Sequence, residues 1–298
     1  MIGHCFSSNG PVRMKEKNIT KTLIISTLIP VILILLFPLP RFPKHAVSAG
    51  NENEYVVGSY KLEQPDRQAH EIIIRADRVR SPRDSFCYRL HLIEYKDDEV
   101  VQEQLLAVNV RFILPTPDVP GDAKALVRFL EPRELRNDKM LAVYDQLWYF
   151  TPKARNPVRI SRQQRLIGQV SNGDIVAADL HYSYQSTLVG EDWLEEKKCY
   201  RLELVRRWDF VTYPKIIYWV AQESYYPMMA EFYSSSDRLM KRAIYKDFKE
   251  SLGAVRPHEI IIEEGLIRGS YTRMLFSGAT FQDLPDAYYQ PSYLERIR

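Results

Sequence analysis

The side chains that could perform chemistry are scattered along the chain without the spacing that a catalytic or metal site needs. Four of the six histidines follow residue 49 and occur singly, with no HxxxH pair to hold a metal on one helix face: His70, His91, His181 and His258. The chain also lacks a GxSxG nucleophile elbow, a Walker loop and a GxGxxG turn. We therefore expect no enzyme activity, no cofactor and no metal.

Two short polar segments contain acid, base or hydroxyl groups but have simpler interpretations. Ser171–Asp174, with the sequence SNGD, is typical of a loop whose glycine adopts a left-handed conformation. Asp174 could then cap a short helix. Glu195–Lys198, with the sequence EEKK, is typical of a solvated turn rather than an acid–base pair. Neither segment changes the expectation of a protein that binds rather than catalyses.

A strand pattern fills the chain from about Ser85 to Phe281. Apolar and polar residues alternate in run after run, as in Tyr200–Leu204 and Met228–Phe232. A period of two places every second side chain on the same face of a sheet. We therefore expect a mainly β protein with short helices, of the α+β class, in which an apolar sheet face must be covered.

Two segments lack this alternation and could supply the cover. His70–Arg80 predicts an amphipathic helix that ends at Ser81-Pro82. Its polar residues, including Asp77, fall outside the apolar stripe. Residues 161–183 are polar and contain two glycines, and they predict a loop with a short helix.

The inward-facing side chains of the strands are the candidate binding residues. They could form a plain core under the helices or line a cavity for acyl chains, and both hold if the sheet is larger than its helices can cover. The candidate lipid-binding residues are Phe86, Tyr88, Leu90, Tyr200, Leu202, Leu204, Ile216, Tyr218, Val220, Met228, Phe232, Ile260, Ile262, Met274 and Phe276.

Residues 1–49 predict a signal peptide. Lys15, Lys17 and Lys21 precede an apolar run, Leu23–Leu39, and Val47–Ala49 supplies small residues for cleavage before Gly50. Met14 is an alternative start, which would make residues 1–13 an over-extended reading frame. The other interpretation is an uncleaved inner-membrane anchor, although the run is shorter than the roughly 20 residues of a bilayer span. Residues 50–298 then predict a single domain in the periplasm.

The charge distribution argues against nucleic acid as a partner. The net charge is +3, but residues 1–49 hold six basic side chains and one acidic one, which leaves 35 basic and 37 acidic residues in the remainder. Without a basic stripe, the mature chain lacks the electrostatic pattern of a nucleic-acid-binding protein.

The mature chain keeps two cysteines, Cys87 and Cys199, both within predicted strands. Export would permit a disulfide between them. We expect two unpaired thiols instead, because small apolar cysteines are often buried in a core.

Several strings, in their order and spacing, resemble an exported family of outer-membrane lipoprotein-sorting proteins in the LolA/LolB superfamily. The resemblance extends from about Ile72 to Leu294, and the strings are Leu147–Pro152, Val158–Gln164, Gln169–Asp174, Thr212–Ile216, Tyr218–Val220, Ala230–Tyr233 and Asp247–Phe248. It implies an unclosed antiparallel β-barrel of about eleven strands wrapped around helices.

The same resemblance implies a function. Such a half-barrel would bind lipoprotein acyl chains or lipid and carry them between membranes through the periplasm, as a monomer that works with an inner-membrane exporter. The alternative is a periplasmic accessory protein that binds the exporter itself. The sequence does not name the lipid, its donor or its acceptor.

Overall fold

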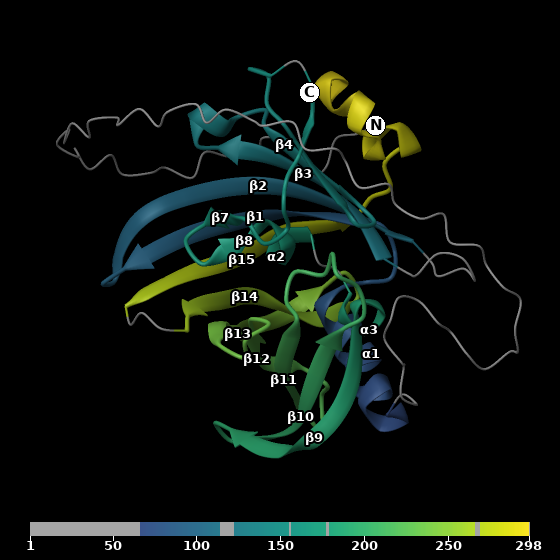
Figure 1. Ribbon diagram of the computed structural model, residues 1–298, viewed down its shortest axis with the longest axis vertical. Helices are drawn as coiled ribbons and strands as arrows, with labels where there is room; N and C mark the ends of the chain where they lie inside the picture. Colours follow the sequence, from purple (N-terminus) through teal and green to yellow (C-terminus); the bar gives the residue numbers. More distant parts are fainter. Residues whose placement is uncertain (1–65, 114–121, 155, 177–178, 266–268, 298) are drawn as a thin grey trace, which may run out of the picture. The chain divides into compact units, whose positions relative to one another are not determined.

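An antiparallel sheet of thirteen strands is the main element of the structure, a computed structural model (Figure 1). The structure describes residues 66–113, 122–154, 156–176, 179–265 and 269–297. The expected signal peptide lies outside the described residues. The strands of the sheet are β1 (Phe86–Lys96), β2 (Glu99–Ile113), β3 (Asp122–Glu131), β4 (Lys139–Val143), β5 (Gln146–Phe150), β6 (Val158–Arg159), β9 (Tyr184–Leu194), β10 (Lys197–Arg206), β11 (Lys215–Ala221), β12 (Pro227–Tyr233), β13 (Leu239–Ser251), β14 (Ala254–Glu264) and β15 (Ser270–Phe281).

The sheet is an unclosed barrel. Its strand order is β6-β5-β4-β3-β2-β1-β15-β14-β13-β12-β11-β10-β9. The first and last strands along the chain, β1 and β15, pair with each other in the middle of the sheet. Every other pair of neighbours consists of strands that follow one another in the sequence of this sheet. The two edges, β6 and β9, do not pair with each other. The expected fold class is confirmed, although the sheet has thirteen strands where the resemblance implied about eleven.

The chain leaves the sheet after β6 and returns at β9. The insertion between them contains a small two-stranded sheet and two short helices: β7 (Arg165–Ile167), β8 (Val170–Ser171), α2 (Asn172–Val176) and α3 (Leu180–Ser183). Figure 1 shows this insertion against the inner side of the curved sheet. Ile175 and Val176 of α2 belong to the core cluster of the inner face. We call residues 161–183 the inner segment.

Helix α1 (Arg67–Arg80) covers another part of the inner face. It begins three residues before the predicted start because the Asp66 carboxylate caps it and accepts a hydrogen bond from the Ala69 amide at 3.0 Å. The other Asp66 oxygen accepts from the Leu188 amide of edge strand β9 at 2.9 Å. Asp77 is buried, which corrects its predicted position outside the apolar stripe.

The outer face of the sheet is also covered in places. The C-terminal 3-10 helices η2 (Asp286–Tyr289) and η3 (Pro291–Arg296) pack on β3, β4 and β5, whereas a third short one, η1 (Arg133–Leu135), precedes β4. The outer cluster is Leu126, Leu141, Phe150, Leu284, Tyr289, Leu294 and Ile297. Among the described residues, no helix is long and apolar enough to cross a membrane.

The two cysteines of the expected mature chain do not pair with each other. Cys199 is buried and free. Cys87 is not a free thiol. The expectation of two unpaired cysteines therefore holds for Cys199 alone.

Candidate functional site

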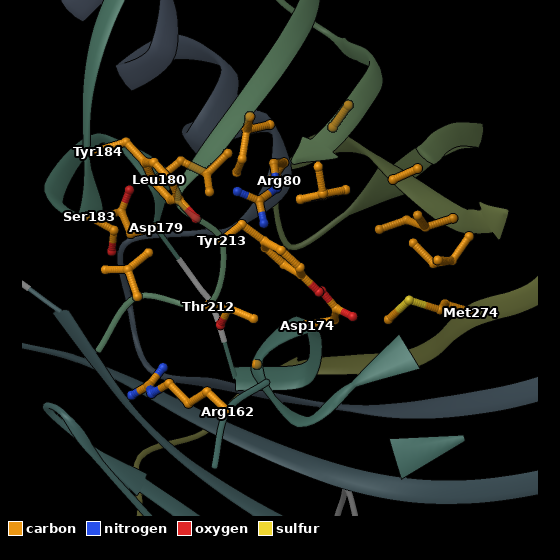
Figure 2. Close-up of a pocket in the computed structure, with 18 of the residues that line it drawn as sticks. Arg80, Arg162, Asp174, Asp179, Leu180, Ser183, Tyr184, Thr212, Tyr213 and Met274 are labelled. Carbon is orange, nitrogen blue, oxygen red and sulfur yellow. The ribbon is translucent and has the colours of Figure 1, made fainter. Parts of the chain in front are cut away.

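Two adjoining cavities lie between the inner face of the sheet and its covering elements. They measure about 80 and 110 Å³. Both are lined largely by apolar side chains from the sheet, and Figure 2 shows the first of them. The five residues that line both cavities are Arg80, Asp174, Tyr245, Ile260 and Met274. The inner segment contributes Ile175 and Val176 to one cavity and Leu180 to the other.

Eight of the fifteen predicted lipid-binding residues line these cavities: Phe86, Tyr88, Ile216, Phe232, Ile260, Ile262, Met274 and Phe276. Six others belong to the same inner core or pack against it without lining a cavity: Leu90, Tyr200, Leu202, Leu204, Tyr218 and Val220. Met228 does not belong to this core. It packs in a separate cluster with Trp219 and Cys199.

An irregularity in strand pairing explains why Met228 lies outside the inner core. The pairing of β11 with β12 shifts register between Trp219 and Val220, so that Trp219 faces Met229 whereas Val220 faces Pro227. Such an irregularity changes which side chains share a face. Period-two alternation alone could not show it.

Sequence reasoning missed the polar groups that line the cavities. Arg80, at the end of α1, and Asp174, in α2, reach into the interior together with the phenol of Tyr213 (Figure 2). Tyr245 also lines both cavities. Asp174 lies within the helix, not at its cap position, although its carboxylate does accept a hydrogen bond from the Ser171 amide at 2.7 Å. Identifying these residues requires knowing which distant parts of the chain contact each other, and the periodicity of strands and helices does not contain this information.

A buried ion pair holds the inner segment to the sheet. The Lys241 ammonium of β13 pairs with the Asp174 carboxylate, and both side chains are at least 90% buried. Lys241 also donates to the Gln169 carbonyl at 3.2 Å. Asp174 accepts a second hydrogen bond from the Tyr213 hydroxyl at 2.9 Å. Burial lowers the pKa of Lys241, and the nearby Asp174 carboxylate opposes that shift.

This ion pair separates the interior from a polar cleft of about 250 Å³ on its other side. Thr212 and Tyr213 line both the cleft and the first cavity. Most of the other residues that line the cleft are polar or charged, among them Arg165, Lys241 and Glu264, and two are apolar, Leu239 and Met240. Thr212 and Tyr213 therefore form a thin partition between a polar outer surface and the mainly apolar interior.

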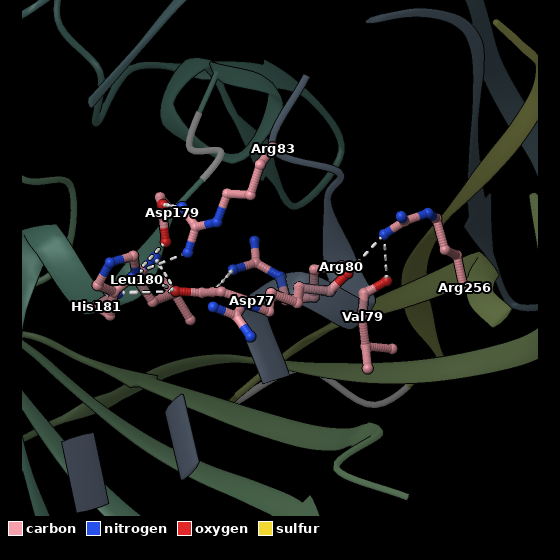
Figure 3. A network of polar contacts seen from close by, with 9 residues as sticks. Asp77, Val79, Arg80, Arg83, Asp179, Leu180, His181 and Arg256 are labelled. Carbon is pink, nitrogen blue, oxygen red and sulfur yellow. Dashed lines mark hydrogen bonds and ion pairs between the residues drawn. The ribbon is translucent and has the colours of Figure 1, made fainter. Parts of the chain in front are cut away.

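A second polar network ties α1 to α3 (Figure 3). The Asp77 carboxylate accepts hydrogen bonds from the Leu180 and His181 amides at 2.9 and 2.8 Å. The His181 Nδ1 atom lies 2.5 Å from Asp179 and 3.2 Å from Asp77. Arg80 pairs with Asp77 at 3.0 Å, and Arg83 pairs with Asp179.

Burial and the neighbouring carboxylates determine the protonation of this network. Burial, followed by repulsion from Asp179, raises the pKa of Asp77 to about 6. Burial alone would lower the pKa of His181, but its hydrogen bonds to Asp179 and Asp77 outweigh this effect and raise it. His181 therefore keeps its proton up to a higher pH than an unperturbed histidine does.

The ligand atoms of Asp77, Asp179 and His181 all lie within 4.8 Å of one another, a spacing that a metal ion could bridge. Both carboxylates, however, are already paired with arginines and with His181. A cation would have to displace Arg80 and Arg83 against their charge attraction. We interpret the cluster as an ionic tie between two covering elements.

Comparison with known proteins places this chain in a family. A solved structure of a LolA superfamily protein from Nitrosomonas europaea has 33% sequence identity and a TM-score of 0.69, and the match covers 76% of this chain and 98% of that one. This chain belongs to the LolA superfamily. A family model described only as an uncharacterized protein matches residues 121–296. No curated protein matches.

Two more distant structures share the LolA-like open barrel. A DUF1329 family protein from Desulfovibrio piger is 22% identical, with a TM-score of 0.66 over 78% of this chain and 100% of that one. A domain described as an outer membrane lipoprotein-sorting protein, from Vibrio parahaemolyticus, is 18% identical, with a TM-score of 0.65 over 77% and 99%. At these identities the two structures support the fold alone.

The pH dependence of stability tests the network around His181. Because its pKa is higher in the folded chain than in the unfolded one, near 6.5, the network stabilises the fold fully below about pH 6.5 and loses this effect as pH rises through the raised pKa. His181→Asn should therefore remove a gain in the free energy of unfolding that the wild type shows as the pH falls through the raised pKa of His181 to about 6.5. Urea unfolding at each pH measures it. A His181→Asn profile that matches that of the wild type would contradict the assignment.

Proposed function

We propose that the protein is a periplasmic carrier that binds lipoprotein acyl chains, or lipid, in the two cavities and moves them between membranes. The observation that carries this proposal is the pair of mainly apolar cavities enclosed between the sheet and two separate covering elements. Membership of the LolA superfamily supports it. The leader expected over residues 1–49 would deliver the chain to the periplasm.

The size of the cavities suggests how a carrier would work. A water molecule needs roughly 10–15 Å³ of cavity volume, so cavities of about 80 and 110 Å³ together hold roughly 13 to 19 water-sized groups. A long acyl chain, or a second chain, needs more room. We therefore propose that the inner segment moves outward on loading and closes again after release.

Capture of the bound molecule tests the proposal directly. The exported protein would be purified from membranes and measured intact by native mass spectrometry, followed by lipid extraction. Co-purified acyl chains are the expected result. An empty protein that instead captures an exporter would contradict the carrier and favour an accessory role.

Filling the cavity should weaken ligand binding without unfolding the protein. Ile260 lines both cavities, and its neighbour Ile261 points to the opposite face of β14. Ile260→Trp should weaken the binding of a fluorescent fatty acid by at least about tenfold, because displacing just two ligand methylenes costs about 1.6 kcal/mol. Ile261→Trp is the matched control and should bind like the wild type. Equal effects of the two substitutions would mean that the ligand does not occupy these cavities.

A further inference from the structure

The polar cleft has no part in the proposed carrier function, although it lies directly beside the first cavity. The Lys241 ammonium, at the wall of the cleft, is 5.3 Å from the centre of the Phe232 ring, which lines the cavity. Thr212 and Tyr213 line both spaces (Figure 2). A ligand in the cavity therefore has to extend past one layer of side chains to place a polar group in the cleft.

The inner segment closes part of this layer. A Cβ atom added at Gly173 of α2 would lie 2.0 Å from the Thr212 hydroxyl oxygen, so the segment approaches Thr212 as closely as a glycine permits. Outward movement of the inner segment, as proposed for loading, would part this contact. The cleft and the first cavity would then be continuous beside Thr212.

The charges that line the cleft favour an anion. They belong to Arg165, Arg238, Lys241 and Glu264. Lys241 is neutralised by Asp174, and the Glu264 carboxylate accepts a hydrogen bond from the Gln169 side-chain amide at 2.7 Å. Arg165 and Arg238 are exposed, and neither forms an ion pair with any residue that the structure describes. The two arginines thus leave the cleft with a surplus of positive charge over its one acid.

The two arginines belong to different parts of the fold. Arg165 begins β7 of the inner segment, whereas Arg238 precedes β13 of the main sheet. Burial lowers the pKa of Lys241 most, and the charge of Arg165 lowers it further, so Arg165 lies within electrostatic reach of the Lys241 ammonium. Cations around one cleft repel each other, and an anion between them is attracted to all of them. The planar guanidinium matches the geometry of a phosphate in particular.

Apolar side chains in the same cleft favour a lipid over a soluble phosphate. Leu239 and Met240 line it beside Arg238, and Met240 is 42% exposed. A small phosphate ester would leave these two side chains in water. The first methylenes of an acyl chain would cover them.

We propose that the polar cleft binds the phosphate head group of an anionic lipid through Arg165 and Arg238, while an acyl chain passes Thr212 into the first cavity. This proposal rests on the proposed carrier function and specifies its substrate class. A phosphate bound by both arginines would also connect the inner segment to the main sheet. Head-group binding would thereby hold the segment closed over the loaded chain.

A pair of lipids that differ only by the phosphate tests the proposal. Oleoyl lysophosphatidate and monooleoylglycerol share the glycerol and the chain, and each is measured by displacement of an uncharged naphthylamine probe. The wild type should bind lysophosphatidate at least about tenfold more tightly at low salt. This preference should shrink as salt rises from about 0.01 to about 1 M, because the Debye length falls from roughly 30 to roughly 3 Å.

Variants of exposed residues assign the preference to the cleft. Arg165→Gln combined with Arg238→Gln should bring the ratio of the two affinities close to one by weakening lysophosphatidate alone. Arg133→Gln combined with Lys153→Gln is the matched control, because it removes the same charge from a separate surface cleft, and it should keep the wild-type ratio. Glu264→Gln, which removes the acid from the cleft, should tighten lysophosphatidate binding roughly two- to fivefold.

Glycerol phosphate, the head group without a chain, separates a lipid from a soluble phosphate ester. Calorimetry should show that it binds the wild type at least about a hundredfold more weakly than lysophosphatidate, because it lacks the methylenes that the cavity buries. Equally tight binding of glycerol phosphate would assign the cleft to a soluble ester and overturn the head-group site.

The remaining failures are distinguishable. Equal binding of the two lipids by the wild type would overturn the head-group site and leave the carrier intact. An equal loss of both lipids in the double arginine variant would also overturn it, because the arginines would then support the cavity and not the phosphate. If neither lipid displaces the probe from the wild type, the carrier proposal fails and the head-group site with it.

Discussion

Replacing Asp174 by alanine is expected to lower the free energy of unfolding by about 3–5 kcal/mol, because it leaves the buried Lys241 ammonium without its counter-ion. Among the described residues, the Gln169 carbonyl is the one hydrogen-bond acceptor that Lys241 would keep. Lys241→Met should cost less, since Asp174 keeps donors from Ser171 and Tyr213. Urea unfolding of each variant measures these differences.

The double variant and a surface pair provide the controls. Asp174→Ala combined with Lys241→Met should be more stable than Asp174→Ala alone, because no unpaired charge remains, and the double-mutant cycle gives the coupling energy. Glu191→Ala breaks the exposed pair with Lys198 and should change stability little. Simple addition of the two single effects would show that Lys241 and Asp174 do not act as a pair.

The strands could be predicted from the sequence because alternation is a local property. The two runs of alternation at Tyr200–Leu204 and Met228–Phe232, for example, lie within strands β10 and β12. Which face of a strand points inward follows from the same alternation, and eight of the fifteen predicted residues do line the cavities. The prediction failed at Met228, where the register shift between β11 and β12 interrupts the period.

The polar groups of the site could not be predicted, because their partners are distant in the chain. Lys241 is 67 positions from Asp174, and Asp77 is 104 positions from His181. On helix periodicity alone Asp77 belongs to the solvent-facing side of α1. It is buried because α3 packs against that side and offers two backbone amides to its carboxylate. Burying the Asp77 carboxylate without hydrogen-bond partners would cost too much free energy. The two amides of α3 therefore make its burial possible.

The sequence also gave no sign that the outer face of the sheet is covered. Period-two alternation predicts an antiparallel sheet with one buried face and one face exposed to solvent. Residues 284–297 instead pack Leu284, Leu294 and Ile297 on the outer side of β3–β5. The C-terminal segment thereby forms a second hydrophobic core on the face of the sheet opposite the cavities.

A disulfide between the inner segment and the wall of the first cavity can test whether the ligand enters and leaves past the inner segment. A Cβ atom added at Gly173 of α2 would lie 3.0 Å from the Thr212 Cβ atom, close to the roughly 3.5–4.5 Å of a disulfide. Thr212 also belongs to the partition between the first cavity and the polar cleft. The pair Gly173→Cys and Thr212→Cys would therefore fasten the inner segment across this partition after a shift of less than about 1 Å.

With that disulfide formed, loading and release of a fluorescent fatty acid should each slow by at least about tenfold, because the segment can no longer swing away from the sheet. The free energy of unfolding should not fall, since the bond constrains the unfolded chain as well. The same protein after reduction is the matched control and should regain the wild-type rates in stopped-flow measurements. In the wild type, hydrogen exchange of residues 161–176 should slow when lipid binds. If the tether leaves both rates unchanged and these amides exchange as slowly as the strands without lipid, the inner segment is fixed core, and the ligand must pass at the other cover, helix α1.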